Sequence, residues 1–372
     1  MSNSIAQLVL FSWPLVVYIL FQRLPLREAL VWSIVAGYLI LPTRTGFDLP
    51  VLPPVDKTLV PSLAAAIMCF GLVFKRRILE AQQAKMGGAI LDQKLKSLDV
   101  GAFEPKRGTR LFWALMIFLF STPILTAMQN GETLIVGTRS IQGMSLYDAM
   151  SMNSTLLVQI IPFLLARRFL SSEEDHKALL KILVIACLAY SLLALYEVRM
   201  SPQLNRKVYG FFPHSWSQHL RGDGFRPIVF LQHGLWLSIF ICYAVIAAFS
   251  LSKAGDAKDR NPAVWVLAGI WLFGVLFLTK SLGAFALAVL IVPVVVIFGR
   301  KIRLLIAAFF AIVVILYPIA RGADVVPVDT VFNIAESINP SRARSFYARV
   351  YNEDILLEKA NEKPLTGWGI WS

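Results

Sequence analysis

The chain has 372 residues, of which 57% are hydrophobic and only 16% are charged. Soluble globular proteins have roughly 45–50% apolar and about 25% charged residues, so this composition excludes a soluble enzyme and indicates an integral membrane protein. The formal net charge of +13 is therefore interpreted as topology signal and contact with anionic lipid, and no nucleic-acid partner is expected. The three cysteines all lie in apolar segments, which supports neither a disulfide nor a metal cage.

Ten apolar segments approach the length of about 20 residues that a helix needs to cross a bilayer. We therefore predict an all-α fold, a polytopic transmembrane helix bundle with about ten spans. In chain order, the predicted spans cover residues 5–21, 29–41, 58–74, 111–128, 151–170, 178–198, 228–250, 263–279, 284–298 and 304–320. No basic residue precedes the first segment, so we interpret it as a retained span rather than as a cleaved signal peptide.

The distribution of Lys and Arg predicts the orientation, because short cytoplasmic loops are enriched in both residues. Residues 75–110 contain nine of them and should be cytoplasmic. The apolar residues of this insert recur at three- and four-residue steps, as is typical of an amphipathic helix on the membrane surface. We therefore divide the chain into spans 1–3 (1–74), the cytoplasmic insert (75–110), a core bundle (111–320) with an outer loop at 199–227, and the start of a large, partly helical outer loop (321–372).

The outer loop 199–227 is the part of the chain richest in candidate chemistry. It has a marked excess of basic residues, which opposes the insertion rule for a translocated loop. His214, His219 and His233 lie in this loop or at the start of the next span. Arginine suits bidentate binding of phosphate, histidine suits acid–base chemistry, and the ring of Trp216 suits stacking on a sugar. The loop thus favours a phosphorylated glycan as ligand; solvated arginines at the lipid surface are the alternative.

The segment after residue 320 predicts a helix that begins at Asn339-Pro340, because asparagine is a common N-cap and proline suits the first turn. Arg342, Arg349 and Glu353 then share one helix face. Two interpretations of Arg349 are open: an exposed i,i+4 ion pair with Glu353, worth about 0.3–0.5 kcal/mol, or an arginine that grips a phosphate above the membrane. The glycines within residues 363–369 predict a tight turn after the helix.

Three motifs resemble those of the O-antigen ligase and Wzy-type polymerase superfamily. Arg349 is followed fifteen residues later by Pro-Leu-Thr-Gly-Trp-Gly (364–369), which is similar to the Arg and Pro-Leu-x-Gly-x-Gly signature of that family's large outer loop. Arg226-Pro227 with residues 230–234 is similar to the family's entry into a span, and Thr-Lys-Ser-Leu-Gly-Ala (279–284) is similar to its Ser-Arg-Gly-Ala turn. The resemblance covers about residues 120–372.

The resemblance implies a metal-independent, inverting glycosyltransferase of the inner (cytoplasmic) membrane that uses no cofactor. The donor would be an oligosaccharide linked to a polyprenyl diphosphate such as undecaprenyl diphosphate, and the acceptor a glycan or a lipid, in O-antigen, exopolysaccharide or capsule assembly. Arg226 and Arg349 would stabilise the departing diphosphate, and His233, or alternatively His219, would accept the proton of the attacking hydroxyl. The other interpretation of His233 is a histidine that packs at a helix end and takes no part in the chemistry. Further residues expected to bind the donor are Arg221, Lys280, Arg342, His219 and Trp216.

The chain also departs from the family pattern. Leu282 stands where the family has an arginine, and the sequence ends at Ser372, before the histidine and further spans that the resemblance implies, so we expect a C-terminally truncated form. Two other functions stay open: a transporter or flippase of lipid-linked glycans, with Lys181 and Glu197 as ionisable candidates near span ends, and a non-catalytic component of a polysaccharide assembly complex. A polymerase and a ligase share the donor, so the sequence does not separate them.

Overall fold

A computed structural model describes residues 2–48, 53–86, 92–93, 109–136, 138–221, 224–254, 261–323, 325–338 and 340–368. These residues are predominantly helical, which confirms the predicted all-α class. Two short antiparallel strand pairs lie between helices: β1 (Leu134–Val136) with β2 (Arg139–Ile141), and β3 (Leu220–Arg221) with β4 (Gly224–Phe225). The chain forms two compact units, the first made of Met1–Pro105 and Ser154–Phe298 and the second of Lys106–Asn153 and Gly299–Ser372.

Among the described residues, seven helices are long and apolar enough to cross a membrane, as in a multi-pass membrane protein. They are α1 (Ser4–Arg23), α3 (Leu59–Met86), α5 (Thr109–Gln129), α6 (Leu146–Phe169), α7 (Glu173–Met200), α9 (Gly234–Lys253) and α12 (Arg300–Gly322). The three remaining predicted spans fall on shorter helices, α2 (Leu26–Ile40), α10 (Pro262–Leu278) and α11 (Leu282–Ile297). The predicted total of ten spans stays a prediction.

Two helix boundaries differ most from those expected from the sequence. α9 begins at Gly234 and not at residue 228, because residues 228–233 form a turn in which Val229 has a φ of +54°. α3 continues through Met86, so the first part of the predicted amphipathic insert belongs to that helix. Residues 87–91 and 94–108 of the insert lie outside the described part of the chain.

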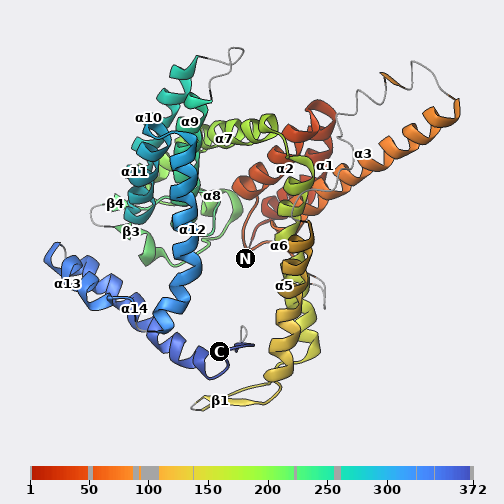
Figure 1. The fold of residues 1–372 in the computed structure, drawn as a ribbon. Helices are drawn as coiled ribbons and strands as arrows, with labels where there is room; N and C mark the ends of the chain where they lie inside the picture. Colours follow the sequence, from red (N-terminus) through yellow and green to blue (C-terminus); the bar gives the residue numbers. More distant parts are fainter. Residues whose placement is uncertain are drawn as a thin grey trace. The chain divides into compact units, whose positions relative to one another are not determined.

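The core of the first unit is built around α9. This helix packs against α7, α10 and α11, and Figure 1 shows α9, α10 and α11 side by side. Its buried face includes Ala244, Ala247 and Ala248, and small residues of this kind let helices approach closely in a membrane. Leu237 of α9 and Leu272 of α10 are fully buried in the same cluster. This packing against α7, α10 and α11 fixes the position of α9, including its start at Gly234.

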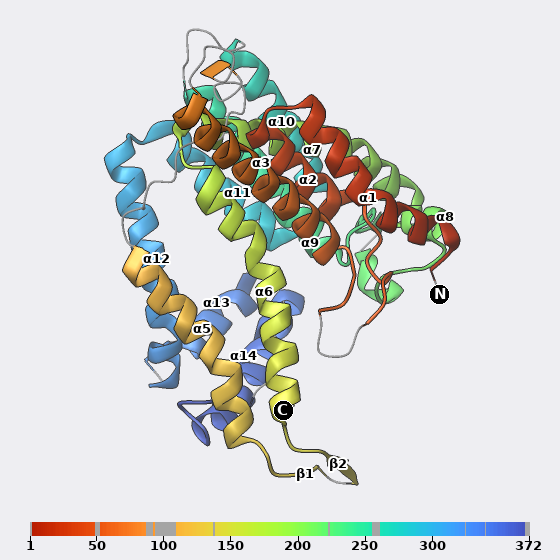
Figure 2. The same ribbon diagram turned by 90° about the vertical axis from the view of Figure 1, so that its right-hand side faces the viewer.

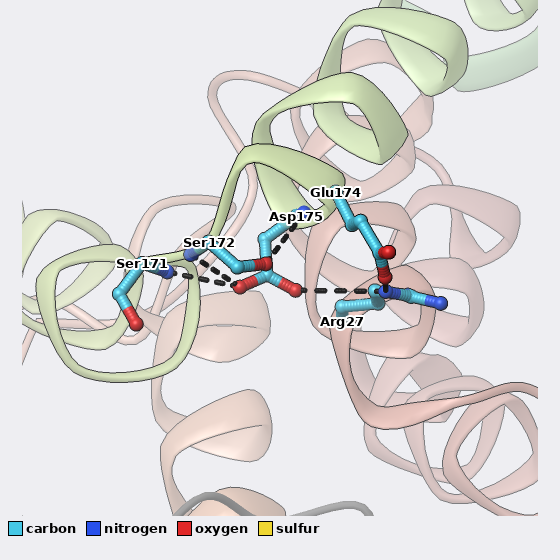
Figure 3. Close-up of polar contacts among 5 residues, drawn as sticks. All are labelled: Arg27, Ser171, Ser172, Glu174 and Asp175. Atoms are coloured by element: carbon cyan, nitrogen blue, oxygen red, sulfur yellow. Dashed lines mark hydrogen bonds and ion pairs between the residues drawn. The ribbon is translucent and has the colours of Figure 1, made fainter. Parts of the chain in front are cut away.

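Helices α1, α2 and α3 pack together in the same unit, and α2 also packs against α7 (Figure 2). α7 starts in a capping box: the Ser172 hydroxyl accepts the Asp175 N–H at 3.1 Å, and the Asp175 carboxylate accepts the Ser172 N–H at 2.9 Å. Arg27 of α2 reaches the carboxylates of Glu174 (3.3 Å) and Asp175 (3.8 Å), as Figure 3 shows. These contacts fix one end of α7.

The second unit contains α5, α12 and two helices that follow them in the chain, α13 (Val328–Ile338) and α14 (Pro340–Asn361). α14 begins at Pro340, as predicted. Helices α13 and α14 pack through the rings of Phe332 and Tyr347, whose centres are 5.4 Å apart. Buried Arg321 at the end of α12 forms an ion pair with Asp354 of α14. The described residues of this segment are thus partly helical, as predicted, and α14 is anchored to α12.

Candidate functional site

The turn that leads into α9 is held by one buried carboxylate. Glu197, fully buried near the end of α7, accepts the N–H groups of Ile228 (2.8 Å) and Val229 (2.7 Å) through Oε2. Its Oε1 accepts the N–H of Leu204 at 2.9 Å. Val229 lies in the left-handed region, which β-branched residues rarely adopt, and surrounding contacts must over-determine such a conformation for it to persist. The carboxylate supplies that constraint because it receives two successive N–H groups.

Arg226 and Lys280, both predicted site residues, meet beside this turn. Arg226 is only 9% exposed, and its Nη2 donates to the carbonyl of Lys280 at 3.4 Å. Lys280 lies in the left-handed region (φ +55°) between α10 and α11. A Cβ added to Gly224 would lie 2.7 Å from the Lys280 Nζ, so the ammonium group sits over the backbone of β4. The Arg226 side chain therefore contacts the Lys280 backbone, and the Lys280 side chain reaches the strand that precedes Arg226.

The N-terminal ends of α9 and α11 lie side by side at the same place. The Ser238 hydroxyl of α9 is 3.0 Å from the Thr279 hydroxyl and 2.8 Å from the Ser281 hydroxyl. Ser281 is the N-cap residue of α11. Helix N-termini carry partial positive charge and unpaired N–H groups, which favour bound anions. Together with Arg226 and Lys280, they form a region of positive potential that suits a phosphate-bearing ligand.

Three histidines border this region. His219 is fully buried at the end of a 3₁₀ helix, η1 (Trp216–His219), and its Nδ1–H donates to the carbonyl of Arg226 at 3.3 Å. Burial lowers the pKa of His219 to about 4, and the charges of His233, His214 and Arg226 act in the same direction. His219 is thus neutral at pH 7. His233, predicted within the first turns of the span, is instead the N-cap of α9, where its Nδ1 accepts the Leu235 N–H at 3.0 Å.

Of the aromatic residues in the loop, Trp216 is 44% exposed. Its ring lies 5.2 Å from that of Phe212 and 6.3 Å from that of Phe225. An exposed indole held by two other rings is available for stacking on a sugar, as the sequence suggested. The backbone of Arg221 belongs to β3, and that of Arg342 to α14, while their side chains lie outside the described part of the structure.

Arg349 and the motif that follows it belong to the second unit. Arg349 is exposed on α14. The first predicted interpretation, an ion pair between Arg349 and Glu353, is not seen among the described residues. The Glu353 carboxylate instead accepts the Tyr317 hydroxyl at 3.1 Å and lies 3.8 Å from the Nε of Arg321. Arg349 is therefore presented at the surface, which is compatible with its second interpretation.

The predicted tight turn after α14 docks on the end of α5. Gly367 has a φ of +65°, so glycine is favoured there. The Thr126 hydroxyl donates to the Thr366 carbonyl (2.6 Å), and the Asn130 side chain donates to the Gly367 carbonyl (3.0 Å). Lys363 donates to the Gln129 carbonyl at 2.8 Å. These hydrogen bonds fix the turn that follows α14 against the end of α5.

A cavity of about 690 Å³ opens beside the Glu197-held turn. Its lining includes Tyr38, Arg44, Asp48, Lys57, Gln232 and Trp236. The rings of Tyr38 and Trp236 are stacked with centres 6.3 Å apart, and the Lys57 ammonium donates to the carbonyl of Phe230 at 3.4 Å. Burial lowers the pKa of Lys57 to about 7, against the opposing charge of Asp56. Aromatic rings beside hydrogen-bonding groups make this cavity suitable for a sugar.

One glycine sets the position of the Arg226 side chain. A Cβ added to Gly234 would lie 2.4 Å from the Cδ and 2.5 Å from the Cγ of Arg226. We therefore expect Gly234→Ala to displace the Arg226 side chain. Any activity that needs the Arg226 guanidinium should then decrease. Gly274→Ala is the matched control, because a Cβ on this α10 glycine meets nothing within 4 Å. The activity proposed in the next subsection, measured for the two variants and normalised to the amount of inserted protein, checks the prediction, and equal activity would contradict it.

No family model matches this chain, and no match is found among curated proteins or among solved structures. The candidate site is therefore inferred from the structure of this chain alone. Its geometry brings together four of the predicted residues, Arg226, Lys280, His219 and His233. Sequence reasoning missed the roles of Glu197, Lys57 and Tyr38. Each has a partner more than 30 residues away along the chain, which gives no local signal.

Proposed function

We propose that this chain is a glycosyltransferase of the inner membrane that acts on polyprenyl-diphosphate-linked glycans, like the O-antigen ligase and polymerase superfamily that its motifs resemble. The observation that carries the proposal is the convergence of Arg226, Lys280 and the N-termini of α9 and α11 beside three histidines. A fixed positive region next to acid–base groups suits a reaction in which a diphosphate leaves.

The chemistry assigned to these residues follows from the charge that the reaction creates. An acceptor hydroxyl attacks the anomeric carbon of the donor sugar, the bond from that carbon to the diphosphate oxygen breaks, and the diphosphate departs with its bonding electrons. Negative charge on the leaving group increases in the transition state, so Arg226 and Lys280 stabilise it more than the ground state. The rigid support of Arg226 keeps its guanidinium in position without reorganisation.

The proton of the attacking hydroxyl needs an acceptor. We assign it to His233, which is half-buried; to accept the proton, its Nδ1 must release the Leu235 N–H that it accepts in this structure. His219 is a weaker choice, because a pKa of about 4 makes its ring a poor base and its free nitrogen, Nε2, is buried. The cavity lined by Tyr38 and Trp236 is assigned to the acceptor sugar, since Gln232 of its wall adjoins His233.

In the same proposal Arg349 binds phosphate oxygens of the donor, as the resemblance of its motif implies. Its support is the exposure of Arg349 on α14, close in sequence to the turn at Thr366 and Gly367 that α5 holds in place. Arg349→Ala is expected to lose transfer to a similar degree as substitution of Arg226.

Deletion of the gene in its host, followed by gel analysis of surface glycans, tests the proposed function. Loss of long chains with single repeats still attached would identify a polymerase. Loss of all attached glycan, with carrier-linked polymer accumulating, would identify a ligase. Complementation by the wild-type gene should restore the wild-type pattern, and complementation by the Arg226→Ala gene should not. Surface glycans unchanged by the deletion would reject the proposal and favour another function, such as transport of lipid-linked glycans.

A further inference from the structure

We infer that His214, His219 and His233 form a binding site for a divalent transition metal, with Zn²⁺ as the best fit. One ring nitrogen of each residue lies within 4.8 Å of those of the other two. His214 precedes η1, His219 ends it, and His233 caps α9, so a bound ion would join three parts of the loop. The inference concerns metal binding alone and does not depend on the proposed glycan transfer.

The spacing of the rings matches a tetrahedral ion. With Zn–N distances of about 2.0–2.1 Å, tetrahedral angles place the centres of imidazole rings about 5.2 Å apart and the ligand nitrogens about 3.3 Å apart. The ring centres are 4.8 Å apart for His214 and His233, 5.5 Å for His219 and His233, and 6.1 Å for His214 and His219. Small side-chain rotations therefore suffice to bring three nitrogens onto one ion.

The hydrogen bonds of the rings leave lone pairs available for a metal. Within the described part of the chain, the buried Nε2 of His219 and the buried Nδ1 of His214 have no hydrogen-bond partner, although buried polar atoms are normally paired. The Nδ1–H of His219 donates to the carbonyl of Arg226, the arrangement that commonly orients a metal-bound histidine. His219 is thus oriented as a ligand through Nε2.

His233 has to exchange an existing contact. Its Nδ1 accepts the Leu235 N–H at 3.0 Å, and its Nε2 lies 3.4 Å from the Oε1 of Gln218. Coordination through Nε2 moves the ring proton to Nδ1, and the Leu235 N–H then loses its acceptor. That N–H belongs to the first turn of α9, where water can replace the lost acceptor. The weakest ligand of the three is accordingly His233.

The donor set selects the class of metal. Three imidazoles suit Zn²⁺, Cu²⁺, Ni²⁺ or Fe²⁺, whereas Ca²⁺ and Mg²⁺ require oxygen ligands. Neutral ligands leave the charge of the ion uncompensated, and Arg226 adds to it, so the remaining coordination position favours water as hydroxide or an anionic oxygen. A three-histidine Zn²⁺ site with one open position has this composition.

Metal binding by the purified full chain in detergent, first stripped with a chelator, tests the inference. We expect one equivalent of Zn²⁺ in equilibrium dialysis, and visible d–d absorption of four-coordinate Co²⁺ when Co²⁺ replaces it. His214→Ala, His219→Ala and His233→Ala should each weaken Zn²⁺ binding by at least about tenfold. His176→Ala is the control, because His176 is exposed in the first turn of α7, and it should bind Zn²⁺ like the wild type.

A second measurement guards against variants that fail to fold. Zn²⁺ should raise the thermal unfolding temperature of the wild type relative to chelator, because a ligand that binds only the folded state stabilises it. The half-buried His214 is the substitution least disruptive to packing, and His214→Ala should unfold like the chelated wild type, with the effect of Zn²⁺ lost. Absence of Zn²⁺ binding by the wild type, or undiminished binding by all three variants, would overturn the inference. Glycan transfer is measured separately in the presence of chelator, because Zn²⁺ bound to His233 would block the ring that the proposed transfer uses as its base.

Discussion

Arg226→Ala is expected to reduce glycan transfer by about 10²- to 10³-fold, the loss typical of removing one preorganised group that stabilises transition-state charge. Arg226 is buried, its backbone N–H donates to the carbonyl of His219 at 2.8 Å, and its guanidinium contacts the carbonyl of Lys280. A charge held in this way needs no reorganisation when the diphosphate departs. The rate of transfer from a polyprenyl-diphosphate-linked donor, measured with purified protein in lipid vesicles, checks the prediction.

Two further variants separate charge from geometry. Arg226→Lys keeps the positive charge but loses the planar fork that binds two phosphate oxygens, so its activity should fall between those of the wild type and Arg226→Ala. Arg206→Ala removes an exposed arginine of α8 (Leu204–Tyr209) in the same loop and should retain activity. Equal transfer by Arg226→Ala and the wild type would remove Arg226 from the site, and equal losses in the Arg206 and Arg226 variants would indicate a general effect of loop charge.

Glu197→Ala is expected to destabilise the folded protein by several kcal/mol. Each buried N–H left without an acceptor costs roughly 1–3 kcal/mol, and this substitution removes the acceptor of Leu204, Ile228 and Val229. The left-handed conformation of Val229 would also lose its constraint. The turn should then relax, and Arg226 and His233 on either side of it should lose their positions. Resistance to unfolding by denaturing detergent, together with transfer activity, measures both consequences.

Two substitutions on α7 serve as comparisons. Glu197→Gln keeps one carbonyl oxygen but turns an NH₂ group toward N–H donors, so we expect an intermediate loss of stability. Glu174→Ala, at the other end of α7, removes a carboxylate whose side chain is 79% exposed and whose contact with Arg27 is a surface ion pair. Such pairs contribute about 0–1 kcal/mol, so stability should hardly change. Similar stability of the Glu197→Ala and Glu174→Ala variants would show that the carboxylate does not hold the turn.

The positions of the helices could be predicted from the sequence because lipid imposes a local rule. A segment in hydrocarbon must form all of its backbone hydrogen bonds internally and present apolar side chains to the lipid. Each span is therefore a continuous apolar run of residues, which can be recognised in the sequence. The helix that begins at Pro340 was equally local, since its start depends on adjacent residues. The start of α9 was predicted too early, because the apolar residues of the turn at Val229 resemble the beginning of a span.

The candidate site was only partly readable from the sequence. Arg226 and Lys280 stood out because they belong to motifs that resemble those of the O-antigen ligase superfamily, and His219 and His233 because three of the four histidines lie in or next to one loop. Glu197 stood out as well, but only as an ionisable residue near a span end. Its role depends on Ile228 and Val229, which lie more than 30 residues further along the chain, and no local pattern records that pairing.

The sequence by itself determined that this protein is helical and membrane-embedded, because hydrophobicity and hydrogen bonding within a helix depend on neighbouring residues. Tertiary structure alone decided that Lys280 meets Arg226 and that three histidines face one another. It also decided that the Glu197 carboxylate holds the turn between Arg226 and His233. These arrangements arise from the packing of α7, α9, α10 and α11, which brings together residues far apart in the chain. Contacts of that kind depend on how whole helices fit, and so they appear only in the folded molecule.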